Sequence, residues 1–311
     1  MAFFKRHKTE NGKGFDLFGA YAFYIPGGTG IFWLTVMFML GAILGNLITV
    51  GLAYGVSANF ATRYGMLISY PVMFIPAMLF ASSASRRHIM FEDGIALDSK
   101  NFGKYQGWCM AIIVSIATIA TAFVTDIFNV ILPQMPETLK KVFEQMMGGP
   151  LWVTLLCVSV FAPFFEEWLC RGMILRGLLQ KMKPGWAIVL SALFFAIIHL
   201  NPWQAVPAFV LGCLFGYVYY KTGSLKLTML MHCVNNTVSV LSSKLPAFKD
   251  LGADASLMDI IPTGIYVIIF IVSAAVLFLA VRYLSKISLK SVQGNCDVIP
   301  GADDIDNGEN L

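Results

Sequence analysis

Eight apolar stretches of roughly membrane-spanning length constrain the fold of this 311-residue chain more than any other feature. A helix needs about 20 apolar residues to cross a bilayer, and only helices and closed barrels satisfy their own backbone polar groups in lipid. The sequence therefore predicts an all-α polytopic membrane helix bundle with about eight transmembrane segments. We expect these segments at about 31–55, 65–85, 107–132, 150–167, 186–200, 203–220, 226–243 and 262–284.

The composition agrees with a membrane protein and excludes several other classes. Hydrophobic residues make up 57% of the chain and charged residues 13%, and the mean hydropathy of +0.71 is far from that of a soluble domain. The formal net charge of +4 is modest and spread along the chain, so it predicts no nucleic-acid partner. The six cysteines form no CxxC pair and lie mostly in apolar stretches, which indicates packing residues.

The basic residues predict the orientation of the bundle. If the eight segments alternate, all but five of the 22 Lys and Arg residues fall on the side that holds both chain ends. Cytoplasmic loops carry the excess of Lys and Arg, so both termini are predicted to be cytoplasmic. With no added domain or retrieval signal, the expected location is a bacterial plasma membrane. The five exceptions are Arg63, Lys140, Lys141, Lys244 and Lys249.

Two adjacent carboxylates and an arginine interrupt the fourth apolar stretch, where charge is costly. On a helix, Glu166 and Glu167 point about 100° apart, whereas Glu167 and Arg171 are four residues apart and share a face. Arg171 can thus neutralise Glu167, which leaves Glu166 to point into a cavity as a general base. The alternative is that both glutamates are solvated charges at a helix end.

Two of the four histidines, His199 and His232, lie in apolar surroundings, where an imidazole needs a partner or a wet cavity. His232 and Asn236 are four residues apart, so one helix face presents two donors to a developing oxyanion. Phe195 has the same spacing from His199 and can hold its ring. A structural role remains the alternative for each histidine alone, but two of them beside an unpaired glutamate favour a site.

Taken in order, these three motifs resemble the CPBP family, which holds CAAX prenyl proteases and bacteriocin-processing or self-immunity proteins, formerly called Abi. The resemblance covers about 150–243, and the first four segments up to 149 contribute nothing diagnostic. The matching motifs are Glu166-Glu167-x-x-x-Arg171, Phe195-x-x-x-His199 and His232-x-x-x-Asn236, with Glu167, Arg171 and Phe195 as supporting residues.

The resemblance implies an intramembrane glutamic endopeptidase with an eight-helix core. In that scheme Glu166 and His199 activate a water, while His232 and Asn236 stabilise the tetrahedral oxyanion. The expected partners are the lipid bilayer and a membrane-associated peptide or protein substrate. The family's substrates differ widely, so the resemblance does not identify this one.

Three other functions share the same residues. Glu166, His199 and His232 could bind zinc with a water in the fourth position, but the sequence has no HExxH, and Asn236 beside His232 suits an oxyanion hole better. The expectation is therefore no cofactor. A transporter could use intramembrane charges as a path, although no inverted repeat is visible. A non-catalytic membrane immunity or scaffold protein would keep its function after Glu166→Gln.

These features divide the chain into four predicted parts. Residues 1–30 form a cytoplasmic N-terminal segment, and 31–149 hold N-terminal membrane helices plus an amphipathic surface helix over 137–148. Residues 150–284 form the CPBP-like catalytic membrane core, in which Asn201-Pro202 breaks a short hairpin and places His199 at depth. Residues 285–311 are predicted to be a disordered acidic tail.

Overall fold

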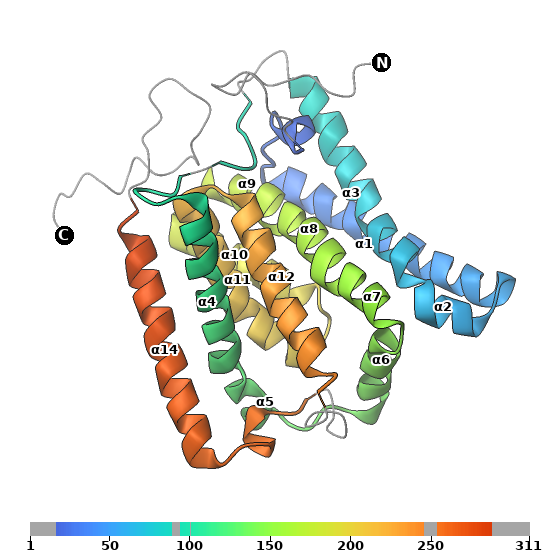
Figure 1. Cartoon of the computed structure of the whole chain (residues 1–311). Coiled ribbons are helices and arrows are strands. Elements are labelled where there is room, and N and C mark those ends of the chain that lie inside the picture. The colour runs from blue at the N-terminus through green and yellow to red at the C-terminus, as the bar shows by residue number, and fades with distance from the viewer. Residues whose placement is uncertain (1–16, 89–93, 100, 246–253, 288–311) are drawn as a thin grey trace.

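The computed structural model describes residues 17–88, 94–99, 101–245 and 254–287, and this part of the chain contains helices and no strand (Figure 1). The predicted all-α fold is confirmed. Nearly all of the predicted acidic tail, 285–311, lies outside the described residues, as does the N-terminal segment before Leu17.

Each of the eight predicted segments contains a helix, and among the described residues five helices are long and apolar enough to cross a membrane. These five are Gly28–Gly55, Met66–His88, Gly107–Ile131, Leu151–Leu179 and Thr263–Ser285. The total of eight crossings and the cytoplasmic position of both termini stay predictions.

The main elements are α1 (Gly28–Gly55), α2 (Ala58–Tyr64), α3 (Met66–His88), α4 (Gly107–Thr125), α5 (Ile127–Ile131), α6 (Glu137–Met147), α10 (Pro184–Ile197), α11 (Pro202–Thr222), α12 (Leu225–Ser242) and α14 (Thr263–Ser285).

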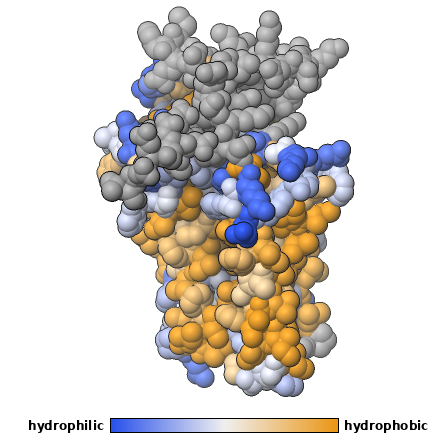
Figure 2. Space-filling model, turned by 90° about the vertical axis from the view of Figure 1, so that its left-hand side faces the viewer, coloured by the Kyte–Doolittle hydropathy of each residue, from blue (hydrophilic) through white to orange (hydrophobic). Residues whose placement is uncertain are grey.

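The outer surface has the pattern of a membrane protein. Figure 2 shows an apolar zone over the middle of one face, with polar side chains toward both ends. Large apolar side chains on the outer helices are exposed, including Leu47 on α1, Leu79 on α3 and Phe278 on α14. An apolar surface of this extent belongs against lipid, so the bundle is a multi-pass membrane protein.

The fourth segment is longer than predicted. Its helix runs over Leu151–Leu179 instead of ending near 167, and it consists of α7 (Leu151–Thr154), η2 (Leu155–Phe161), α8 (Ala162–Glu167), η3 (Trp168–Leu175) and α9 (Arg176–Leu179). The hydropathy pattern predicted that the segment ends at its first charged residues. Arg171 and Arg176 are nevertheless 0% and 1% exposed, and both have hydrogen-bond partners inside the protein. The stretch after the predicted end of the fourth segment is therefore helical up to Leu179, and Glu166 lies at mid-helix.

Local signals set the ends of the shorter helices. Asn201 caps α11 by accepting a hydrogen bond from the Gln204 N–H at 2.9 Å, and Pro202 takes the first helical position. Gly223 ends α11 in the left-handed conformation at φ 66°. Leu200, directly after His199, has the same unusual sign at φ 57°, although it is not glycine. The tight turn between α10 and α11 thus follows the second predicted motif directly.

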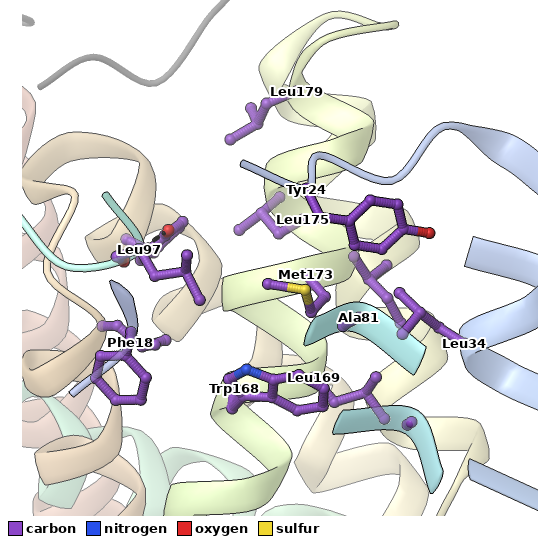
Figure 3. Close-up of a cluster of buried hydrophobic side chains, with 14 of the residues drawn as sticks. Phe18, Tyr24, Leu34, Ala81, Leu97, Trp168, Leu169, Met173, Leu175 and Leu179 are labelled. Atoms are coloured by element: carbon purple, nitrogen blue, oxygen red, sulfur yellow. Dashed lines mark hydrogen bonds between the residues drawn. The ribbon is translucent and has the colours of Figure 1, made fainter. Parts of the chain in front are cut away.

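The largest core surrounds η3. The N-terminal strap, residues 17–27, packs against this helix, so that Phe18 stacks on Phe164 and Tyr21 meets Trp168 edge to face. Figure 3 shows Trp168, Leu169, Met173 and Leu175 of η3 within this core. The Arg176 guanidinium donates to the backbone carbonyls of Tyr21, Tyr24 and Ile95 and so fixes the strap to this helix.

Helices α1 and α3 approach each other closely through two glycines of α1. A Cβ at Gly41 would lie 2.0 Å from the Met73 carbonyl oxygen, and one at Gly45 would lie 2.7 Å from the Ser69 carbonyl oxygen. Small residues four apart allow membrane helices to bring their backbones together. The Ser69–Met73 turn of α3 is thereby pressed against α1.

Candidate active site

The two glutamates of the first motif lie on α8, between two π-helical stretches, and Arg171 lies within the second of these, η3. A π-helical turn is wider than an α-helical one and is found mostly at functional sites. Within this helix the residues Glu166, Glu167 and Arg171 are 9%, 0% and 0% exposed. The three charges are therefore enclosed by protein in the middle of a spanning helix.

The predicted pair of Glu167 and Arg171 is confirmed. Arg171 Nη1 donates to Glu167 Oε1 at 2.7 Å, and Nη2 donates to the Gly212 carbonyl oxygen on α11 at 2.9 Å. The guanidinium also lies over the rings of Phe195 and Phe215, 4.6 and 5.4 Å from their centroids. Arg171 thus joins the motif helix to α10 and α11 and neutralises one of the two carboxylates.

His232 lies between the two glutamates. Its Nδ1 is 3.1 Å from Glu167 Oε1, and its Nε2 is 3.9 Å from Glu166 Oε2. A carboxylate can only accept, so the contact with Glu167 assigns the hydrogen to Nδ1 and turns Nε2 toward Glu166. The rings of Phe195 and Phe215 both pack against the imidazole, with centroids 5.4 and 5.7 Å from its centroid.

Glu166 has a partner from the N-terminal half of the chain. The Tyr70 hydroxyl on α3 donates to Glu166 Oε1, whereas Oε2 is buried and has no hydrogen-bond partner. Sequence reasoning missed Tyr70 and assigned nothing diagnostic to the residues before 149. The available signal was a lone tyrosine in an apolar stretch, but nothing in the sequence connects it to a residue 96 positions away.

His199 joins the cluster through Phe195. Its Nδ1 is 2.8 Å from the Phe195 carbonyl oxygen, and the two rings meet edge to face at 5.1 Å. The carbonyl can only accept, so Nδ1 carries the hydrogen, and Nε2 of the neutral ring is left as an acceptor. Glu166 and His199 both lie in the described part of the chain, and no direct hydrogen bond joins them there. The water-activating pair of Glu166 and His199 therefore stays a prediction.

Asn236 is held by the motif helix itself. Its Nδ2 donates to the Val158 carbonyl oxygen at 2.8 Å, and its Oδ1 accepts from Asn235 Nδ2 at 3.1 Å. A carboxamide nitrogen has two hydrogens, so one remains for another acceptor. Asn236 lies one turn from His232 on α12, as the spacing predicted.

The positions of the site residues can be set against the coordination that a metal ion requires. A catalytic zinc takes three protein ligands and leaves a position for water. Within the described residues, no three His, Cys, Asp or Glu side chains gather in a way that could hold a metal ion. Glu167 Oε1 is already shared by Arg171 and His232. Glu166, His199 and His232 do not gather as such a group here, and the expectation of no cofactor stays a prediction.

Comparisons with known proteins agree with the motifs. Residues 148–238 match the family model described as type II CAAX prenyl endopeptidase Rce1-like, and this range contains all three motifs. A protein of Bacillus subtilis (strain 168) named "Putative membrane peptidase YdiL" is 22% identical over 130 residues, which cover 42% of this chain and 52% of that relative. The match thus spans about half the length of the relative. No solved structure matches the chain. Both matches support the resemblance of residues 148–238 to the CPBP family of CAAX-type membrane proteases.

Proposed function

We propose that the protein is an intramembrane endopeptidase of the glutamic type, which hydrolyses a peptide bond in a membrane-associated peptide or protein without a metal. The observation that carries the proposal is the bare Oε2 of Glu166, buried and 3.9 Å from His232 Nε2. That separation is too long for a direct hydrogen bond, yet one water could contact both atoms at about 2.8 Å. A buried carboxylate oxygen without a partner is costly, and a reacting water explains its retention.

In the proposed reaction, Glu166 takes a proton from the water as its oxygen attacks the peptide carbonyl carbon. His199, whose Nε2 is an acceptor, orients the same water. The carbonyl oxygen becomes an oxyanion, and the tetrahedral intermediate then breaks its C–N bond. Glu166 returns the proton to the leaving amine, so the enzyme is regenerated.

His232 and Asn236 are the proposed oxyanion donors, each worth about 3 kcal/mol in a dry site. His232 Nδ1 already faces Glu167, so donation from Nε2 requires the doubly protonated ring. The carboxylates of Glu167 and Glu166 lie beside the two ring nitrogens. The second hydrogen of Asn236 Nδ2 completes the pair.

The first test compares peptides from cells with the wild-type protein and with Glu166→Gln. The expected result is loss of one or more cleavage products at unchanged protein level, because the amide cannot take the proton. Glu144→Gln, an exposed change on α6, is the matched control and should leave the products unchanged. Identical peptides from wild type and Glu166→Gln would favour a scaffold.

The second test addresses the metal. The purified protein should keep its activity after exhaustive treatment with a polar chelator, because the carboxylate, the imidazoles and the carboxamide supply all steps. A polar chelator is preferred, since a hydrophobic one could partition into the apolar bundle and inhibit directly. Activity that is lost on chelation and restored by zinc would contradict the glutamic mechanism.

A further inference from the structure

We infer that Tyr70 is a positioning residue for Glu166, which holds one carboxylate oxygen so that the other faces the reacting water. The inference rests on the proposed function, because it assigns Tyr70 to the same site. It adds a fourth helix, α3, to the three that carry the family motifs.

The contact itself has a defined direction. The Tyr70 hydroxyl is the donor, and the ionised Glu166 carboxylate can only accept. The bond occupies Oε1, whereas Oε2 has no partner and lies 3.9 Å from His232 Nε2. The two oxygens of one carboxylate are thereby distinguished. Without the hydroxyl, both would be equivalent and the group could rotate about its last bond.

The phenol ring is fixed by aromatic neighbours. Tyr70 packs against Phe74 at 5.7 Å between ring centroids, and Phe74 is fully buried. Phe74 in turn stacks on Phe165 at 5.2 Å and 14° between planes. Phe165 directly precedes Glu166, so the same stack sets the position of the donor and of the residue that accepts.

The backbone of Tyr70 is fixed as well. Its turn of α3 begins at Ser69 and includes Met73, and these are the two carbonyls that meet Gly45 and Gly41 of α1. The close approach of α1 and α3 leaves little room for this turn to shift. A rigid second layer of this kind is what holds a catalytic group within a fraction of an ångström.

Tyr70→Phe is the direct test, because it removes the hydroxyl and keeps the ring in its stack. We expect kcat to fall about 10- to 100-fold, since a misplaced reacting group costs that much, while KM stays within about twofold. Protein level should match that of Tyr220→Phe, and the thermal midpoint should be lower, because Glu166 Oε1 is left without its donor. Tyr220 is a buried tyrosine whose hydroxyl has no hydrogen-bond partner, so its variant controls for loss of a buried hydroxyl.

Two outcomes would overturn the inference. An unchanged kcat in Tyr70→Phe would make Tyr70 a packing residue. A raised KM with kcat retained would mean that the hydroxyl contacts substrate and not Glu166.

A second readout does not depend on peptidase activity. Dicyclohexylcarbodiimide modifies carboxyl groups in apolar surroundings, and mass spectrometry locates the adduct. Glu166 should react faster in Tyr70→Phe than in wild type, because Oε1 has lost its donor, and Glu166→Gln should remove the adduct. If wild type shows no proteolysis but this difference persists, the proposed function fails and the positioning contact stands. Equal labelling rates in both proteins would refute the contact.

Discussion

The ion pair of Glu167 and Arg171 allows stability and chemistry to be separated. Both side chains are 0% exposed, and Arg171 Nη1 lies 2.7 Å from Glu167 Oε1. Removing one partner of such a pair leaves an uncompensated buried charge, which costs about 3–5 kcal/mol. Arg171→Met should therefore lower the free energy of unfolding by that amount, and the amount of protein in the membrane should fall with it.

The double variant Glu167→Met with Arg171→Met gives the sharper expectation. Replacing both charges with apolar groups of similar size often restores stability, so the double variant should be more stable than either single one. Recovery should be incomplete, since His232 Nδ1 loses its acceptor and an unpaired buried donor costs about 1–3 kcal/mol. Activity should be lost in the two variants that lack Glu167, because His232 is no longer oriented, and it should fall in Arg171→Met, in which Glu167 has lost its partner.

The assay is reversible unfolding in mixed micelles, followed by intrinsic fluorescence, with cleavage measured on the same samples. Glu137→Gln removes the exposed acid that pairs with Lys140, whose second partner Asp254 remains, and it should leave the unfolding curve unchanged. Additive losses in the double variant would show that the two charges are not energetically coupled. Arg171→Met with normal stability and no activity would make the pair a chemical participant and refute the division between Glu166 and Glu167.

Three further predictions follow from other contacts. Gly212→Ala should destabilise the protein by about 1–3 kcal/mol, because its Cβ would lie 3.2 Å from Arg171 Nη2, and it should lower activity more than the same change at the exposed, uncrowded Gly51. Arg176→Met should release three backbone carbonyls, so limited proteolysis should cut the N-terminal strap faster than in wild type. Single cysteines at Lys13 and Lys286 should be labelled only from the inside, and labelling of either from outside would contradict the orientation.

Hydropathy and helical spacing were enough to predict the membrane bundle and the core of the candidate site. The pair of Glu167 and Arg171 follows from a spacing of four, which is local information. The same reasoning placed the end of the fourth segment near 167 because it treats charge as exposed. In the structure, Arg171 and Arg176 are buried with partners from distant parts of the chain, and a single sequence does not reveal such partners.

Tyr70 and Gly212 were missed for a related reason. The hydroxyl of Tyr70 and the carbonyl of Gly212 act only where other helices bring them to the motif, over separations of 96 and 41 residues. A tyrosine or a glycine in an apolar stretch does not by itself indicate a function. The π-helical stretches before and after Glu166 are likewise set by packing, and no local propensity in the sequence indicates them.

The contacts of Arg176 impose an order on assembly. The guanidinium that holds the N-terminal strap comes 155 residues after Tyr21 and 152 after Tyr24. The strap is synthesised first, but it has no docking site until the helix that ends at Leu179 has emerged and entered the bundle. A segment that is made before the first spanning helix is therefore among the last to reach its native position.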